Sequence, residues 1–397
     1  MTHNASNQSP FRVGYLIDQL NAGGSERQLS ELAAGMVDRG HVVEIFCYNA
    51  MGEGHFDQYV EKRGVKLHRM KGRGKLQKLC GIKRWVETFR PQILHGFMKR
   101  ASSLAVLSNL PWRRFGVVAS DFSTATYAPY KPSLWGALVL FHLADCVVTQ
   151  TVMNRNSLCR LAPMLRGKLR IIRNGVDDTR FFPISKLAGK VFRFICVGTV
   201  SEVKNPVRLV QAVRILRQQT TQPFILEWVG RYQNTSKGEP TQAYMKARQL
   251  IDEYGLQDLI SFKGLSESVV NEYQRADALV HVSVQEGIPN AVVEGMACGL
   301  PIVVSRVSDL PLIVEAGDNG ITCNAFDPMD IARALKAMLE MQSSDRMAMG
   351  CRSRKLASEW FGLQRFVTDY EEQYSDIIKV CKERRRLGEE ESVDLVS

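Results

Sequence analysis

Residues 286–305 read EGIPNAVVEGMACGLPIVVS, and this stretch is the most informative part of the chain about its fold and its candidate site. It places Glu286 in a loop after a predicted strand and Glu294 inside the helix that follows. Asn290 caps that helix or lies in its first turn, so Glu294 lies about one turn in. Because helical side chains lean toward the N-terminus of their helix, Glu294 is expected to point back at the loop of Glu286.

This loop and helix bring together two kinds of group that a nucleotide-sugar needs. The free N–H groups and the dipole of a helix N-terminus hold an anion. Carboxylates accept hydrogen bonds from the hydroxyls of a sugar or a ribose. The stretch therefore favours a nucleotide-sugar site. The simpler alternative is an ordinary strand–loop–helix turn with glutamates on its surface.

Strands and helices alternate along the chain in two blocks. The first block begins with a predicted strand at 11–17 and a helix at 26–39, and the second restarts with a strand at 191–197. Such βαβ alternation predicts an α/β fold with two doubly wound parallel sheets, and 397 residues are too many for one core. The predicted division is a disordered tail at 1–10, domains at 11–183 and 190–355, a C-terminal helix at 356–382 and a charged tail at 383–397.

Two other loops follow predicted strands and precede helices. Gly23-Gly24 lets the backbone approach an oxyanion closely at a helix N-terminus, although glycine-rich turns are common at this place in α/β folds. In the second block, Lys204 precedes a helix with Asn205 as its cap and Pro206 at its first position. An ammonium group there is placed to neutralise a leaving diphosphate. The alternative for Lys204 is a surface lysine beside a helix cap.

Three polar residues fall at the ends of predicted strands in the first block: His95, Ser120 and Asp121. In parallel sheets ligands bind beyond the carboxyl ends of the strands, so these residues are candidates for the acceptor side of a site. A buried, hydrogen-bonded histidine is an equal alternative for His95. No paired carboxylate of the kind that glycosidases use is evident beyond Asp121.

The composition is that of an ordinary soluble globular protein, and its cysteines and histidines show no metal-ligand spacing. Nine cysteines occur singly without a Cys-x-x-Cys pair, which favours a reducing compartment and argues against a structural zinc site. The seven histidines are equally dispersed. We see no signal peptide, and the most apolar run is interrupted by His142 and Asp145, so we expect a cytoplasmic protein without a membrane span.

The net charge of +11 comes from one segment, because residues 61–115 contain 15 basic and 2 acidic side chains. Apolar residues recur among the basic ones at helical spacing, which is typical of a surface that contacts anionic lipid head groups. The alternative is a solvated face, and nucleic acid has little support beyond charge. The residues predicted to contact the membrane are Arg69, Lys71, Arg73, Lys75, Lys78, Lys83 and Arg84.

From about residue 11 to residue 380 the chain resembles glycosyltransferase family 4, the retaining transferases of GT-B fold. The resemblance rests on the Gly-x5-Lys-Asn loop at Gly198, on the quoted 286–305 stretch and on the Asn-Gly-Val-Asp turn at 174–177. It implies two Rossmann-like domains that face each other across a cleft, the first on the acceptor side and the second binding the nucleotide-sugar. The C-terminal helix would cross back to the first domain.

The resemblance also implies roles for individual residues. Glu294 would bind the ribose hydroxyls, Glu286 the hydroxyls of the transferred sugar and Lys204 the diphosphate, so Lys204 and Glu286 are the predicted catalytic residues. No metal or cofactor is implied, and the acceptor would be a lipid-linked or growing polysaccharide at the inner face of the cytoplasmic membrane. The predicted donor-binding residues are Gly24, Gly198, Thr199, Lys204, Glu286, Gly287, Ile288, Pro289, Asn290 and Glu294.

Two departures from the family pattern leave alternatives open. Thr199 stands where the family usually has an arginine, and Arg231 is a candidate substitute for that cation. Ser308-Asp309 stands where the family usually has two glycines. The alternatives are a sugar-nucleotide epimerase of the same fold and a catalytically silent relative that only binds nucleotide-sugars.

Overall fold

The computed structural model describes residues 9–71, 74–122, 132–185, 189, 191–233 and 238–394, with only the backbone described at 132–134 and 387–394. The chain forms two compact units, which we call the first unit (residues 1–175 and 363–397) and the second unit (residues 176–362). The chain thus passes between units at Gly175 and again at Gly362. The tail predicted at 1–10 lies almost wholly outside the described residues.

The first unit contains a parallel sheet of seven strands in the order β3-β2-β1-β4-β5-β6-β7. The order reverses direction at β1 and β4, which makes the sheet doubly wound. Valine, isoleucine and leucine dominate the central strands because helices bury both faces of the sheet. The strands are β1 (Arg12–Ile17), β2 (Val42–Cys47), β3 (Lys66–Arg69), β4 (Ile93–Gly96), β5 (Gly116–Ser120), β6 (Cys146–Thr149) and β7 (Leu169–Ile171).

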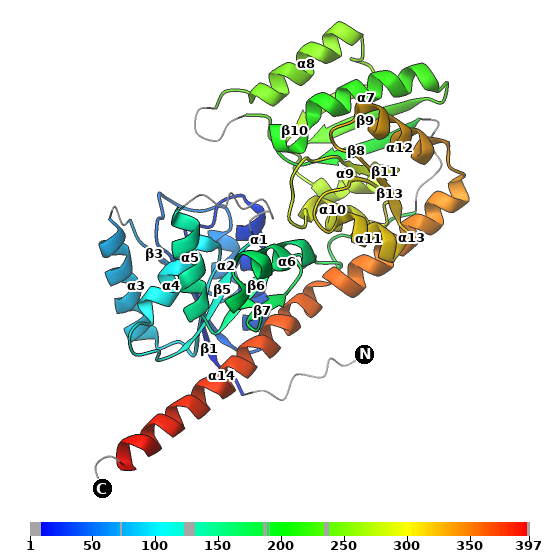
Figure 1. Cartoon of the computed structure of the whole chain (residues 1–397). Helices are drawn as coiled ribbons and strands as arrows, with labels where there is room; N and C mark the ends of the chain where they lie inside the picture. Colours follow the sequence, from blue (N-terminus) through cyan, green and yellow to red (C-terminus); the bar gives the residue numbers. More distant parts are fainter. Residues whose placement is uncertain are drawn as a thin grey trace. The chain divides into compact units, whose positions relative to one another are not determined.

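Helices cover both faces of the first sheet. On one face lie α3 (Lys75–Phe89), α4 (Lys99–Ser108), α5 (Pro132–Leu143) and α6 (Val152–Leu161), which share a core with the strands. On the other face α1 (Gly24–Asp38) packs beside α2 (Asp57–Lys62) and α14 (Leu363–Asp394). Figure 1 shows α3, α4 and α5 next to one another.

A buried carboxylate fastens α14 to the first unit. Glu371 accepts from the guanidinium of Arg39 at 2.5 Å and lies 2.8 Å from Nε2 of His41. The carboxylate side chain is only 3% exposed, so the two partners replace the water that it loses. The helix continues to Asp394, through most of the charged tail predicted at 383–397.

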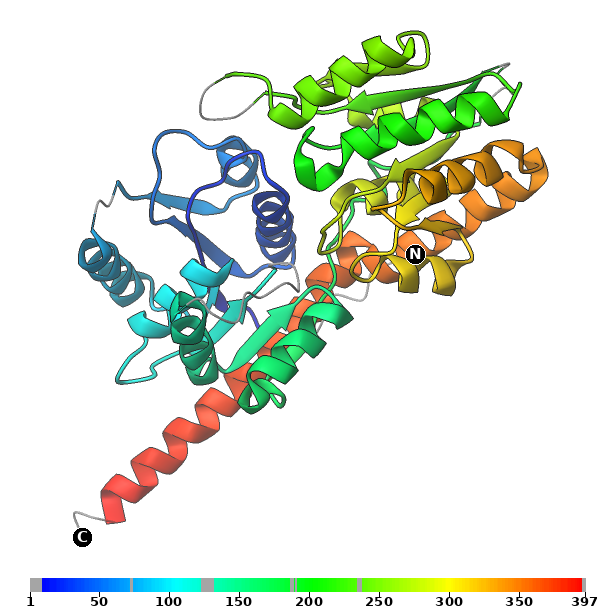
Figure 2. The same cartoon turned by 45° about the horizontal axis from the view of Figure 1, so that its top comes forward.

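The second unit contains a parallel sheet of six strands in the order β10-β9-β8-β11-β12-β13. This sheet also reverses direction, here between β8 and β11. Its strands are β8 (Phe192–Val197), β9 (Phe224–Val229), β10 (Ile260–Gly264), β11 (Ala278–His281), β12 (Ile302–Ser305) and β13 (Gly320–Cys323). Figure 2 shows these strands between two layers of helices.

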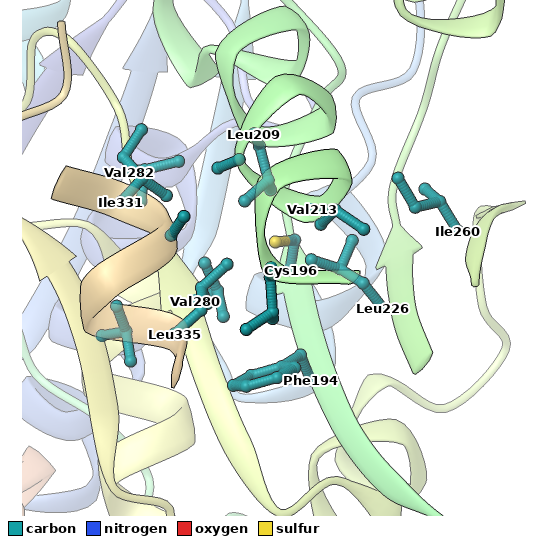
Figure 3. Close-up of a cluster of buried hydrophobic side chains, with 14 of the residues drawn as sticks. Phe194, Cys196, Leu209, Val213, Leu226, Ile260, Val280, Val282, Ile331 and Leu335 are labelled. Carbon is teal, nitrogen blue, oxygen red and sulfur yellow. The ribbon is translucent and has the colours of Figure 1, made fainter. Parts of the chain in front are cut away.

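The helices of the second unit pack on both faces of its sheet. One face is covered by α7 (Pro206–Gln219), α8 (Gln242–Tyr254) and α12 (Pro328–Glu340). Figure 3 shows this layer, in which Leu209 and Val213 of α7 and Leu335 of α12 meet the strand residues Phe194 and Val280. The other face is covered by α9 (Val269–Arg275), α10 (Asn290–Ala297), α11 (Leu310–Gly317) and α13 (Ser343–Phe361).

Candidate active site

The loop that holds Lys204 is fixed by contacts with its own sheet. It leaves β8 at Gly198, whose φ of +138° favours glycine, and a Cβ on Gly230 would lie 2.1 Å from the carbonyl oxygen of Gly198. The indole N–H of Trp228 donates to that same oxygen at 2.8 Å. Two glycines are therefore required for β8 and β9 to end side by side at this edge of the sheet.

The side chain of Asn205 does not make the capping hydrogen bond that the sequence predicts. The residue stands at the N-cap position of α7 in the left-handed conformation, with φ of 63°, but its side chain makes no capping bond. Instead its amide donates to the carbonyl oxygens of Val282 at 3.0 Å and Ala325 at 2.7 Å. The residue after Lys204 is thus tied to the carboxyl end of β11, which places the lysine beside the 286–305 loop.

Lys204 and Glu286, which lie 82 residues apart in the sequence, form an ion pair. Nζ of Lys204 lies 2.5 Å from Oε1 of Glu286, and the two side chains are only 24% and 12% exposed. His281, the last residue of β11, lies 2.9 Å from the same oxygen through Nε2, and Oγ of Ser283 lies 3.0 Å from that nitrogen. A cation, a carboxylate and an imidazole therefore meet at the carboxyl edge of the second sheet.

The charges in this cluster follow from burial and from the ion pair. Burial alone would raise the pKa of Glu286, but the hydrogen bond from His281 and the charge of Lys204 outweigh it and lower the pKa to about 2. Burial and the positive charge of Lys204 lower the pKa of His281, so its ring is neutral at pH 7. A neutral ring with its proton on Nε2 donates to Glu286, and the carboxylate stays ionised.

Glu294 lies in α10, the helix that Asn290 begins, and is 5% exposed. Its Oε2 accepts from the hydroxyl of Tyr273 in α9 at 3.0 Å. A carboxylate with this little exposure and a phenol partner is held in one position, unlike the surface glutamate of the simpler sequence interpretation. Pro289 occupies the N-cap position of α10, and the side chain of Ile288 packs in the core.

Thr199 stands where the family usually has an arginine, and the loop that contains it is hydrogen-bonded to the backbone of Arg231. Thr199 is exposed, and Val200 donates its N–H to the carbonyl oxygen of Arg231 at 2.7 Å. Arg231 follows Gly230 directly, so its backbone runs along the loop of Lys204. This proximity supports Arg231 as the substitute cation, which remains a prediction.

In the first unit, His95, Ser120 and Asp121 are almost fully buried. His95 lies 2.6 Å from the hydroxyl of Tyr374 through Nδ1 and 2.5 Å from Oγ of Ser120 through Nε2. Burial lowers the pKa of His95 to about 3. The carboxylate of Asp121 lies 3.6 Å from Nζ of Lys99. These surroundings fit the alternative given for His95, that of a buried and hydrogen-bonded histidine. Its role on the acceptor side stays a prediction.

Gly24 is the first residue of α1 and follows Gly23, which has the extended backbone of an N-cap. Gly24 belongs to the first unit and Lys204 to the second, and the phosphate contact of Gly24 stays a prediction. Among the residues described by the structure, no group of three or more His, Cys, Asp or Glu side chains is arranged to hold a metal ion.

The basic segment divides into paired and unpaired residues. Arg69 makes ion pairs with Asp57 at 2.7 Å and Glu61 at 3.0 Å, so its charge is compensated locally. Lys78 donates to the side chain of Asn49 at 2.9 Å. Arg73 lies outside the described residues. The remaining predicted contacts, at exposed or partly exposed positions, are Lys71, Lys75, Lys83 and Arg84.

Sequence reasoning missed His281, Ser283 and Tyr273. His281 and Ser283 lie five and three residues before Glu286, which is a spacing that could have drawn attention to them. Tyr273 is 21 residues from Glu294 and lies in another helix, so no local pattern indicates it.

Replacing His281 with phenylalanine is expected to raise the pKa of Glu286, because a buried carboxylate then loses one hydrogen bond. Activity that needs ionised Glu286 would then be lost at a higher pH than in the wild type, where the pKa is about 2. At neutral pH we expect a roughly tenfold loss, as for a hydrogen bond to a charged group. The measurement is the acid limb of the kcat/KM profile.

His281→Gln provides the control, because its side-chain amide reaches the position of Nε2 and can restore the bond that phenylalanine cannot make. If both substitutions left the acid limb unchanged, His281 would have only a packing role.

Two family models match the chain. Residues 177–356 match the model described as glycosyl transferases group 1, and residues 22–180 match the model described as glycosyltransferase family 4. D-inositol 3-phosphate glycosyltransferase 2 of Catenulispora acidiphila is 28% identical over 210 residues, which are 50% of this chain and 48% of that protein. N-acetyl-alpha-D-glucosaminyl L-malate synthase of Bacillus anthracis is 28% identical over 131 residues, which are 33% of this chain and 34% of that protein. The chain therefore spans about half or less of the length of these curated relatives.

Among solved structures, the Anabaena protein HepE in complex with UDP is similar with a TM-score of 0.79 and 16% identity. The match covers 92% of this chain and 100% of that chain. The predicted fold class, α/β with two doubly wound Rossmann-like domains of GT-B type, is confirmed.

Proposed function

Because the chain belongs to glycosyltransferase family 4, the group 1 glycosyltransferases, we propose that it transfers a hexosyl group from a nucleoside-diphosphate sugar to a saccharide hydroxyl, with retention of configuration. The observation that supports this most is the partly buried cluster of Lys204, Glu286 and His281, followed in the chain by a helix that holds the buried Glu294. The cluster supplies one cation for a diphosphate and two carboxylates for hydroxyl groups.

In the proposed reaction, the bond between the anomeric carbon and the diphosphate oxygen breaks while a bond to the acceptor oxygen forms. The acceptor proton passes to the leaving diphosphate. Lys204 stabilises the negative charge that develops on the diphosphate, which is the contribution that positioned cations make to such transfers. To do so it exchanges its contact with Glu286 for one with a phosphate oxygen.

That exchange gives Glu286 its own role. Once Lys204 binds the diphosphate, one oxygen of Glu286 is released to accept hydrogen bonds from the transferred sugar, while His281 holds the carboxylate in place. Glu294 accepts from the ribose hydroxyls. Lys204 supplies the charge that a metal ion provides in other transferases, so we propose that the reaction needs no metal.

Donor binding is testable by thermal unfolding of the full chain with UDP and UDP-glucose. A ligand that binds only the folded protein stabilises it by about 2.7 kcal/mol at 100 times its Kd. We expect a rise in Tm with at least one nucleoside diphosphate. When the corresponding nucleotide-sugar is incubated with the protein and a saccharide acceptor, we expect a glycosylated product. A donor that is isomerised without an acceptor would indicate an epimerase, and binding without any product would indicate a silent relative.

We further propose that the protein acts in the cytoplasm on a lipid-linked or growing polysaccharide, docked on an anionic membrane by α3 and α5, which both pack against α4. Lys75, Lys83 and Arg84 of α3 accompany exposed Leu76, and α5 exposes Trp135 and Val139. Basic groups with apolar side chains beside them suit the lipid interface. Within the described part of the chain, none of the helices combines the length and hydropathy needed to cross a bilayer.

Vesicle pelleting tests this docking. The wild type should pellet with phosphatidylglycerol vesicles in a salt-dependent way and not with phosphatidylcholine vesicles, because each basic residue near an anionic surface contributes about 1 kcal/mol. Replacing both Lys83 and Arg84 with glutamine should weaken binding roughly 30-fold. Recovery that is equal for both vesicle types would leave α3 as a solvated face.

A further inference from the structure

We propose that His281 takes up a proton when the donor binds, so that an imidazolium replaces Lys204 as the cation beside Glu286. This inference rests on the transfer reaction proposed above, in which Lys204 exchanges its contact with Glu286 for one with a phosphate oxygen. It assigns to His281 a change of charge during the reaction, in addition to its role of holding the carboxylate in place.

One carboxylate oxygen is shared by two nitrogen groups. Oε1 of Glu286 lies 2.5 Å from Nζ of Lys204 and 2.9 Å from Nε2 of His281. The carboxylate side chain is only 12% exposed, so these two partners replace most of the water that it loses. In the free protein the lysine supplies the positive charge and the imidazole supplies a hydrogen bond.

Donor binding removes the positive charge from this arrangement. A shielded carboxylate that loses its cation is destabilised, because little solvent is there to compensate it. The diphosphate also brings further negative charge close to the ring. Among the described groups that contact Glu286, only His281 can gain a positive charge, so both changes favour its protonated form.

The charges that act on the ring agree with this sequence of events. Burial and the positive charge of Lys204 lower the pKa of His281, while its hydrogen bond with Glu286 and the carboxylate charge raise it. An anion bound to Lys204 offsets the lowering effect of the lysine, and the raising effect of Glu286 remains. The pKa of His281 is therefore higher in the complex than in the free protein.

The other titratable groups on the elements around His281 do not replace this charge. On β8, burial raises the pKa of the Cys196 thiol, so the thiol is uncharged at neutral pH. On α10, which packs against β11, Glu294 is hydrogen-bonded to Tyr273. The charge balance around the ring thus depends on Lys204 and Glu286.

The ring has a position for the added proton. Nε2 lies 2.9 Å from Glu286 and 3.0 Å from Oγ of Ser283, whereas Nδ1 makes no hydrogen bond with the described residues. The proton therefore goes from solvent to Nδ1. A cavity of about 10 Å³ adjoins His281 and Lys204, which is close to the size that one water partner needs.

The test measures proton uptake by titration calorimetry of the full chain. UDP-glucose and GDP-mannose are each titrated at about pH 6.5, the ordinary pKa of histidine, in buffers that differ in ionisation enthalpy. The dependence of the observed enthalpy on the buffer gives the number of protons taken up. Nucleotide-sugars are used because their diphosphate is esterified at both ends, whereas the terminal phosphate of UDP itself exchanges a proton near this pH. We expect an uptake of roughly half a proton or more per bound ligand.

His281→Gln separates the hydrogen bond from the proton, because the amide reaches Glu286 but has no basic nitrogen. This variant should bind the same nucleotide-sugar without proton uptake. The wild type should bind up to about tenfold more tightly for each unit by which the pH falls between the bound and the free pKa of His281, and the variant should lose this dependence. His55→Gln, at an exposed histidine of the first unit, is the matched control and should keep the uptake.

Binding by the wild type without proton uptake would overturn the inference and leave the proposed transfer reaction intact. Uptake that persists in the His281→Gln protein would also overturn it, because the proton would then go to Glu286 or to another group. If the wild type bound neither nucleotide-sugar, the result would count against the proposed donor function, and this role of His281 would be rejected with it. The wild-type measurements do not depend on the folding of any variant.

Discussion

Replacing Lys204 with alanine is expected to lower kcat/KM for sugar transfer by about 10³-fold. One positioned group that stabilises developing charge in a low-dielectric site contributes about 10²- to 10³-fold in rate, and a full positive charge lies at the upper end. Lys204 is 24% exposed and is held in the cluster by Glu286 at 2.5 Å, and it exchanges that contact for a phosphate oxygen when the donor binds. The measurement is steady-state transfer with the donor that raises the Tm of the wild type.

The substitution also leaves the carboxylate of Glu286 without its cation, which destabilises the protein and could be mistaken for the cause of lost activity. The double substitution Lys204→Ala with Glu286→Gln removes both charges, so we expect it to recover much of the stability without recovering transfer. Wild-type turnover by the purified single variant would refute the role of Lys204.

Replacing Glu294 with glutamine is expected to weaken binding of the nucleoside diphosphate by roughly 100-fold. The amide keeps the shape of the side chain but loses the charge, and hydrogen bonds to a charged group contribute about 1.5–3 kcal/mol each. Two ribose hydroxyls together thus account for about 3 kcal/mol. Calorimetric titration with UDP measures the loss directly.

The matched ligand control for Glu294 is the 2′-deoxy form of the same nucleoside diphosphate. The wild type should bind the deoxy ligand more weakly, while the Glu294→Gln protein should distinguish the two ligands much less. If the variant kept the full preference for ribose, Glu294 would not contact those hydroxyls. Tyr273→Phe, which removes the 3.0 Å bond to Glu294, should give a smaller loss in the same direction.

The sequence predicts the second sheet well because local patterns determine it, and the roles of its site residues stay predictions. The alternation of strands and helices gives the parallel sheets, and a helix that begins at Asn290 places Glu294 one turn in. The approach of Lys204 to Glu286 is harder to predict. It depends on Asn205, whose side chain bonds to Val282 and Ala325 over 77 and 120 residues instead of capping α7.

The first unit is less predictable from its sequence, because long-range partners decide what its polar residues do. His95 meets Tyr374 over 279 residues, and Arg69 forms ion pairs with Asp57, which lies outside the basic segment, and with Glu61 inside it. Local patterns do not reveal these partners, because they lie elsewhere in the sequence.

The central claim is that Lys204 leaves Glu286 to bind the donor diphosphate while His281 keeps the carboxylate in place. A crystal structure of the full chain with a bound nucleoside diphosphate tests it most directly. We predict Nζ of Lys204 at about 2.8 Å from a phosphate oxygen, with Glu286 still on Nε2 of His281. A diphosphate bound elsewhere, with Lys204 still on Glu286, would contradict the account.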